Sequence, residues 1–265
     1  MIIEILCIGT ELLSGITLNT NAYSLCSEIT NVGGVVRRVT VVCDDLIEIS
    51  SAMRESLTRK PDILITTGGL GATYDDMTFE ALAAALGKKV VLDDRAVEML
   101  KRSYERRNLH YELTEFRLKM ATIPEGSTPI QNPVGSAPAV MEQVEDVSIF
   151  CLPGVPSEMQ AIFEEYILPQ IKKSVGKFVA EELNYNTRGL TEAMIAPVLI
   201  KIVQSHPKNM IYLKTHPRGY YRKKTPQIKI QLISRGNNEK EVKNRLATIS
   251  KIIEKEVVKC GGIIC

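Results

Sequence analysis

Two alternating patterns of apolar residues run through the first 170 positions of the chain. Short apolar runs at 2–8, 35–42, 63–65 and 147–152 are suited to buried strands. After each of the first three runs, apolar residues recur every three or four positions, which is typical of helices. These helices are predicted to begin near Asn21, Asp45 and Asp76. Strands that alternate with helices predict an α/β fold, here a three-layer wound and mostly parallel sheet.

The pattern changes after Ser174 and Gly176, where we place a boundary between domains 1–172 and 173–265. Strand-like runs at 178–185, 210–215 and 227–233, with helical stretches at 191–204 and 239–258, predict a second, smaller α+β domain. The basic and aromatic segment 218–224 has two readings. It suits a solvated hairpin tip, and it also has the residue types that stack on bases.

A glycine-rich turn follows the strand at 63–65 and precedes a helix that ends at Gly87. Glycine lets the backbone approach a ligand closely, and a helix N-terminus presents free N–H groups to an anion such as phosphate. The predicted phosphate-binding residues of this turn are Thr66, Thr67, Gly68, Gly69, Leu70 and Gly71.

Asp75 and Asp76 follow this turn and have two interpretations. They suit the N-cap of the next helix. They also suit a divalent ion, because carboxylates repel a phosphate unless a cation lies between them, and Mg²⁺ commonly binds one or two carboxylates plus phosphates. Since Glu11, Asp45 and Asp76 each follow a predicted strand, the three carboxylates are expected to meet at the carboxyl edge of the sheet.

Composition excludes several classes of protein. The net charge of +2 gives no global field for nucleic acid or an acidic membrane, and no apolar run is long enough to span a bilayer. The apolar N-terminus contains Glu4 and lacks a basic region, so it is predicted to be a core strand of a cytoplasmic protein rather than a signal peptide. None of the six cysteines forms a CxxC pair, which argues against a disulfide framework or a zinc site.

Four segments, in order, resemble one known family: IGTELLSGITLNTN at 8–21, TTGGLGATYDD at 66–76, the stretch 120–140, and LPGVPSEM at 152–159. They are similar to the N-terminal module of the CinA, or competence-damage-inducible, family. That module in turn resembles the molybdopterin-binding domain of MoeA, MogA and MoaB proteins. Asp76 matches the essential aspartate of those proteins, and Asp45 a second acidic position. Ala72 and Ala139 replace a usual proline and glycine.

The resemblance covers about residues 1–170, and the remainder is similar to the small KH-like domain of the same family. This part lacks the GxxG clamp of RNA-binding KH modules, so no nucleic-acid partner is expected. The chain ends at Cys265, and we therefore do not expect the amidase domain found in many CinA proteins. The superfamily implies a homo-oligomer, a dimer or a trimer.

The resemblance implies a metal-dependent pyrophosphatase that acts on ADP-ribose or a related dinucleotide. Two alternatives remain: a molybdopterin-binding or adenylyl-transferring protein, and a non-catalytic nucleotide-binding protein. Asp76 and Asp45 are the predicted catalytic residues, and Asp75, Asp76, Asp45 and Glu11 the predicted ligands of Mg²⁺, Mn²⁺ or Co²⁺. The further residues predicted to contact the nucleotide or pterin are Asn19, Asn21, Asn132, Gly135, Ser136, Pro153, Gly154 and Ser157.

Overall fold

A computed structural model describes residues 1–107, 112–207, 210–218 and 225–265 of the chain. The chain divides into two compact units, Met1–Val175 and Gly176–Cys265. The basic and aromatic residues 219–224 lie outside the described residues, as does Asn108, the expected last residue of the charged helix that the sequence predicts over 93–108. Within the described ranges, each helix is too short or too polar to cross a membrane.

Unit 1 is built on a six-stranded sheet in the order β2-β1-β3-β8-β7-β6. The first four strands are parallel, and β7 and β6 are antiparallel to their neighbours, so the predicted wound and mostly parallel sheet is confirmed. A separate antiparallel pair joins β4 to β5. The strands of unit 1 are β1 (Ile2–Ile8), β2 (Val35–Val42), β3 (Ile63–Thr67), β4 (Val90–Leu92), β5 (Thr122–Pro124), β6 (Thr128–Ile130), β7 (Ala139–Val144) and β8 (Val147–Leu152).

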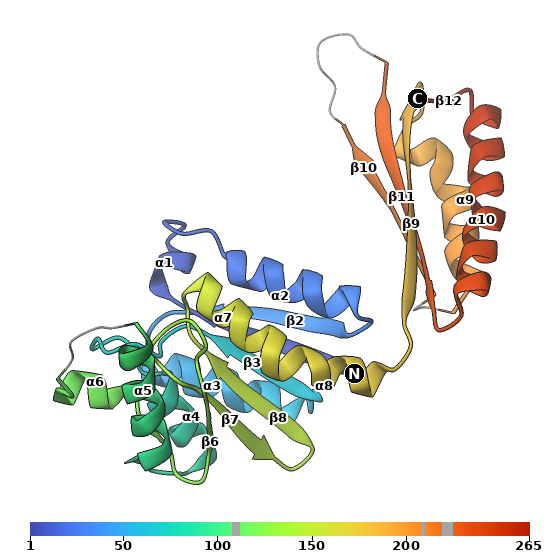
Figure 1. Ribbon diagram of the computed structural model, residues 1–265. Helices are drawn as coiled ribbons and strands as arrows, with labels where there is room; N and C mark the ends of the chain where they lie inside the picture. Colours follow the sequence, from blue (N-terminus) through green and yellow to red (C-terminus); the bar gives the residue numbers. More distant parts are fainter. Residues whose placement is uncertain (108–111, 208–209, 219–224) are drawn as a thin grey trace. The chain divides into compact units, whose positions relative to one another are not determined.

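Helices cover both faces of this sheet (Figure 1). Leu6 and Ile8 of β1 belong to a buried cluster with α3, α4 and α5, whereas Ile5 and Cys7 belong to a second cluster with α2, α7, η1 and α8. Two covered faces explain why β1 and β3 read as continuous apolar runs. The helices are α1 (Thr10–Leu13), α2 (Thr20–Asn31), α3 (Leu46–Thr58), α4 (Thr78–Leu86), α5 (Asp94–Arg106), α6 (Glu115–Lys119), α7 (Pro156–Ile162), the π-helix η1 (Phe163–Ile167) and α8 (Leu168–Val175).

Three local predictions are corrected. The prolines and glycines of the stretch 112–143 predict a long loop, but the stretch contains α6, β5, β6 and most of β7. Asp75 and Asp76 do not cap α4, which begins at Thr78 without a side-chain cap. Asn19, rather than Asn21, caps α2 by accepting a hydrogen bond from the Ala22 N–H. The last correction leaves the Asn21 side chain free for other contacts.

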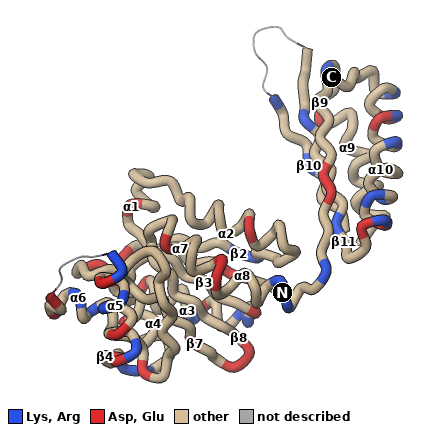
Figure 2. Tube along the Cα trace, in the orientation of Figure 1, with Lys and Arg blue, Asp and Glu red and all other residues tan. Residues whose placement is uncertain are grey.

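Unit 2 is a four-stranded antiparallel sheet in the order β10-β11-β9-β12, with α9 and α10 packed against one face. Alternate residues of β11 are buried under these helices, and Pro197 is accommodated inside α9. Figure 2 shows acidic and basic segments mixed along α10. The elements are β9 (Val179–Arg188), α9 (Glu192–Gln204), β10 (Ile211–Pro217), β11 (Gln227–Gly236), α10 (Glu239–Lys259) and β12 (Ile263–Ile264).

All six cysteines are free thiols. Cys7 and Cys151 lie in the core of unit 1 and are fully buried, as expected for small hydrophobic residues. Burial raises the pKa of the Cys151 thiol to about 12, although the neighbouring Thr66 hydroxyl acts in the opposite direction.

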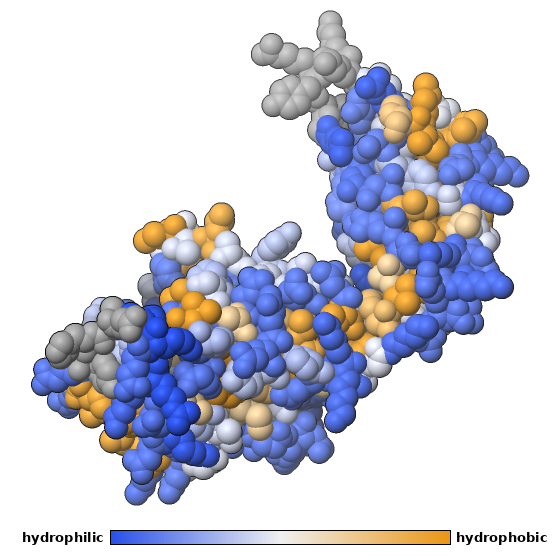
Figure 3. Space-filling view, in the orientation of Figure 1, coloured by the Kyte–Doolittle hydropathy of each residue, from blue (hydrophilic) through white to orange (hydrophobic). Residues whose placement is uncertain are grey.

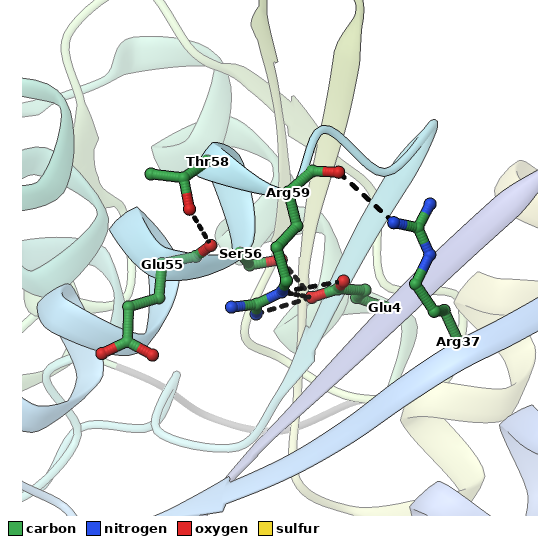
Figure 4. Close-up of polar contacts among 6 residues, drawn as sticks. All are labelled: Glu4, Arg37, Glu55, Ser56, Thr58 and Arg59. Carbon is green, nitrogen blue, oxygen red and sulfur yellow. Dashed lines mark hydrogen bonds and ion pairs between the residues drawn. The ribbon is translucent and has the colours of Figure 1, made fainter.

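A buried ion pair joins β1 to the end of α3 (Figure 4). Glu4 is only 2% exposed, and its carboxylate accepts hydrogen bonds from Arg59 Nη2 at 2.7 Å and Ser56 Oγ at 2.9 Å. Burial raises the pKa of Glu4, but the hydrogen bonds from Arg59 and Ser56 and the positive charges of Arg59 and Arg38 outweigh it. The net result is a pKa below the ordinary value of 4.5.

Removing only the cation of this pair is expected to destabilise unit 1. Arg59→Ala leaves a buried carboxylate without its charged partner, so the free energy of unfolding should fall by about 3 kcal/mol, as measured by urea denaturation. The double variant Glu4→Leu with Arg59→Leu removes both charges and should lose less. A single variant that is no less stable than the double variant would contradict a dominant role for the ion pair.

The same pair predicts a pH dependence of stability. Because the pKa of Glu4 is lower in the folded chain than its ordinary value of 4.5, its contribution is fully present above pH 4.5 and disappears as the pH falls through the folded pKa. The difference in unfolding free energy between the unmodified chain and Glu4→Gln should therefore be constant near neutral pH and shrink below pH 4.5. A difference that grows on acidification would contradict this sign.

Candidate functional site

The candidate site lies at the carboxyl ends of β1, β3 and β8. Strands β2 and β3 flank β1 on opposite sides, so the chain reverses its direction of winding at β1. In wound α/β sheets, ligands bind in the crevice outside the strand ends at such a reversal. The segments that follow these three strands therefore form the candidate site.

The glycine turn after β3 is pressed against neighbouring backbone. A Cβ on Gly68, whose φ is +110°, would lie 2.2 Å from the carbonyl oxygen of Ile8, and a Cβ on Gly154 would lie 3.3 Å from the Gly68 Cα. Gly69, with φ +67°, packs against the Thr78 hydroxyl. These conformations and approaches require glycine, so the turn brings the three strand ends together through their main chains.

Hydrogen bonds close the turn onto the start of α4. The Thr78 hydroxyl donates to the Gly68 carbonyl at 2.7 Å, and the Thr78 N–H donates to the Gly69 carbonyl at 3.1 Å. The Gly68 N–H donates to the Leu152 carbonyl at 3.0 Å. In the described part of the chain, none of the hydrogen bonds uses the N–H groups of Gly69, Leu70 and Gly71. Leu70 is buried, whereas Gly69 and Gly71 are partly exposed.

The Asp76 carboxylate lies beside this turn. Its Oδ2 would be 2.5 Å from a Cβ on Gly71 and accepts hydrogen bonds from the Thr73 N–H at 2.8 Å and the Thr73 hydroxyl at 2.5 Å. The single proton of the Thr73 hydroxyl is shared between Asp76 and Asp75, and this contact, backbone hydrogen bonding and the charge of Lys119 lower the pKa of Asp75. Thr73 thus holds both aspartates in one short loop.

Asn21 bridges the ends of β3 and β8. Its Nδ2 donates to Thr67 Oγ1 at 2.9 Å and to the Gly154 carbonyl at 2.8 Å, and Thr67 Oγ1 donates to the Pro153 carbonyl at 3.0 Å. Because a carbonyl only accepts, the nitrogen of the Asn21 amide must face Gly154, which assigns the other end to Oδ1. That oxygen is buried, and no described residue donates to it.

Asn21 lines a cavity of about 110 Å³ at this edge of the sheet. Glu11, Asn19, Thr67 and Gly154, all predicted site residues, line it too. A buried acceptor without a donor in a residue that lines a cavity suits a ligand hydroxyl or an ordered water.

The three carboxylates predicted to converge do not do so. Asp45 is exposed and caps α3, accepting from the N–H groups of Ile47 and Glu48. Glu11 is exposed and packs over Gly9. Within the described ranges, no three His, Cys, Asp or Glu side chains gather closely enough to hold a metal ion. The Asp45 carboxylate therefore caps α3. The prediction that Glu11, Asp45 and Asp76 converge was wrong.

Asp44, and not the predicted Asp45, turns its carboxylate toward the segment that follows β1. Its Oδ2 accepts from the Thr10 N–H at 2.7 Å, and the Asp44 N–H donates to the Thr10 hydroxyl at 3.2 Å. Asp44 thus reaches the end of β1. The only sequence signal was that two adjacent aspartates follow β2, and only one of them can cap α3.

The predicted residues of the 132–136 loop form a buried cluster of their own. Asn132 Oδ1 accepts from the N–H groups of Val134 and Gly135, and its Nδ2 donates to the Ala137 carbonyl at 2.9 Å and to Glu158 Oε2 at 2.7 Å. These four bonds fill the hydrogen-bonding capacity of Asn132, so it shapes the loop and is not free for a ligand.

Glu158 is the residue of this cluster that the sequence did not identify as a site residue. A Cβ on Gly135 would lie 2.0 Å from the Glu158 carboxylate, which explains the glycine. Ser136 accepts a hydrogen bond from Arg107, Pro153 is buried, and Ser157 is exposed on the first turn of α7.

Comparisons with known proteins show the family of this chain and two full-length relatives. The model of the family described as probable molybdopterin binding domain matches residues 4–173. A protein from Sulfurisphaera tokodaii is 40% identical over 262 residues, 98% of this chain and 97% of that one, and one from Metallosphaera sedula is 38% identical over 261 residues, 98% and 96% of the two chains.

A solved structure adds a named relative. The crystal structure of the protein CinA, of unknown function, from Thermoplasma acidophilum is 40% identical with a TM-score of 0.58, over 66% of this chain and 99% of that one. The chain therefore belongs to the family of the probable molybdopterin binding domain and is a relative of CinA.

Proposed function

We propose that unit 1 binds a nucleotide through its diphosphate and hydrolyses the pyrophosphate bond with the help of a divalent ion, ADP-ribose or a related dinucleotide being the substrate. One observation carries the proposal: the Asp76 carboxylate lies against Gly71, beside three unused backbone donors at the end of a central strand. A carboxylate and anion-binding donors are thus side by side.

The charges explain why a cation belongs to this proposal. A carboxylate and a phosphate about 4 Å apart repel by roughly 4 kcal/mol at an effective dielectric near 20. Mg²⁺ binds through one or two carboxylates plus substrate phosphates, so the absence of a three-carboxylate cluster from the described residues is compatible with it. Asp76, with Asp75 beside it, would hold Mg²⁺, Mn²⁺ or Co²⁺. Such an ion neutralises the diphosphate and assists attack by water.

The residues around the turn have separate tasks in this proposal. The N–H groups of Gly69, Leu70 and Gly71 bind the diphosphate, and Thr73 orients Asp76 through two hydrogen bonds. The unpaired Oδ1 of Asn21 accepts a hydrogen bond from a hydroxyl of the ligand, for which a ribose is suited. Asp45 and Glu11 no longer have a metal-binding role in the proposal, since Asp45 caps α3 and Glu11 covers Gly9.

The family favours a second candidate, a protein that binds molybdopterin or transfers an adenylyl group to it. The same diphosphate site and Asp76 would serve that reaction. A non-catalytic nucleotide-binding protein is the third candidate. For unit 2 we propose a KH-like domain that contributes to a dimer or trimer in the cytoplasm.

A substrate assay separates these candidates. Purified protein incubated with ADP-ribose and Mg²⁺, Mn²⁺ or Co²⁺ is expected to release AMP and ribose phosphate, measured by chromatography. Binding of a pterin, or adenylation of molybdopterin from ATP, without cleavage of ADP-ribose would favour the second candidate. Binding of ADP-ribose with no cleavage in any of the three ions would favour the third.

Asp76→Asn is expected to reduce turnover by about 100-fold or more while the melting temperature hardly changes. Asparagine keeps an oxygen for Thr73 but loses the negative charge that holds the ion. Asp146→Asn is the matched control, because it makes the same charge change at an exposed position of the β7–β8 turn. Equal turnover in Asp76→Asn and in this control would exclude a metal-binding role for Asp76.

A further inference from the structure

A second cavity of unit 1, larger than the one lined by Asn21, opens next to the Asp76 loop. It has a volume of about 570 Å³ and is formed by the segment after Gly71, the end of β4 and the helix α6. Its volume falls in the range of small-molecule sites, which is about 300–1,000 Å³. None of its lining residues belongs to the candidate site described above except Thr73, which holds Asp76.

Thr73 connects this cavity to the diphosphate site. It lines the cavity, and it donates its N–H and hydroxyl to Asp76 Oδ2. Its carbonyl accepts a hydrogen bond from Lys119 Nζ at 2.6 Å, which fastens α6 to the loop. A ligand whose phosphates lie at Gly69–Gly71 would therefore reach the cavity with its next group.

Two exposed aromatic side chains line the cavity. Tyr74 is 91% exposed and Phe116 is 71% exposed, and both line the cavity. Figure 3 shows hydrophobic side chains gathered at the edge of unit 1 where α6 lies. Exposed aromatic rings that border an apolar cavity indicate a binding surface, because burying them against a ligand removes apolar area from water.

The cavity is also lined by one basic and one acidic residue, Lys119 and Glu115. The ammonium group of Lys119 lies at its border, near enough to Asp75 to lower the pKa of that carboxyl. Aromatic faces beside a hydrogen-bond donor suit a flat, nitrogen-containing ring, which stacks on the faces and accepts at its ring nitrogens. Lys119 uses one N–H for the Thr73 carbonyl, and an aliphatic chain would use the apolar walls but offer no acceptor to its other two.

We propose that the cavity between Tyr74 and Phe116 binds the base of the nucleotide whose diphosphate lies at the glycine turn. The inference rests on the proposed function for the identity of the ligand, and it assigns the base to a site separate from the Asn21 cavity. Adenine and a pterin share the flat heterocyclic chemistry, and the experiment distinguishes them.

The test measures binding by calorimetry in the presence of Mg²⁺ for four probes: ADP-ribose with a methylene group in place of its bridging diphosphate oxygen, which cannot be cleaved there, AMP, 6-carboxypterin and inorganic pyrophosphate. Phe116→Ala should raise the dissociation constants of this ADP-ribose analogue and of AMP by about tenfold, the typical effect of losing one stacked aromatic ring. Pyrophosphate, which has no ring, should bind equally well to both proteins. Phe116→Tyr keeps a ring and should restore the affinity.

Tyr23→Ala is the matched control, since Tyr23 is 79% exposed on α2 of the same unit and lines neither cavity. Equal affinity of Phe116→Ala and the unmodified protein for both adenine probes and for the pterin would overturn the inference, as would failure of all three to bind. If the pterin alone responds to Phe116→Ala, the base site stands and its ligand is a pterin. If ring compounds respond but pyrophosphate does not bind, the base site stands and the diphosphate proposal fails.

Discussion

The close approach of three main chains at Gly68 is the constraint on which the candidate site depends. A Cβ at this position would lie 2.2 Å from the Ile8 carbonyl, so any other residue would push the end of β3 away from the end of β1. Gly154 approaches the same Gly68 Cα from β8. The Asn21 bridge, the unused donors of the turn and the position of Asp76 all require these strand ends to stay within this distance.

The two cavities beside the site differ in the chemistry of their lining residues. The small cavity is lined by Asn21, which has a buried acceptor, whereas the larger cavity is lined by two aromatic residues and by Lys119 and Glu115. The Asp76 loop borders the larger cavity through Thr73, and the glycine turn connects it to Thr67, which lines the smaller cavity. A ligand with a polar sugar, a charged diphosphate and a flat base has the same order of chemical properties.

Sequence reasoning succeeded where one residue type has one physical use. The glycines at 68 and 69 predicted a tight turn with a close approach of the backbone, and both residues have positive φ. Buried strands followed from apolar runs such as that of β3. Polar residues were harder, because Asp and Asn serve equally well as caps, turn formers and ligands. In the structure, Asp45 caps α3, and the Asn132 side chain holds the 132–137 loop by hydrogen bonds. The short strands β5 and β6 were missed because their prolines resemble a loop.

The fully buried thiol of Cys151 has a practical consequence for studying this sheet. With a pKa of about 12, the side chain holds almost no thiolate at neutral pH, and reagents cannot reach it while β3 and β8 stay paired. Its rate of modification therefore records how often the centre of the sheet opens to solvent. Cys265, which is exposed, provides the rate for a freely accessible thiol in the same sample. The chain thus contains its own probe of local opening beside the site.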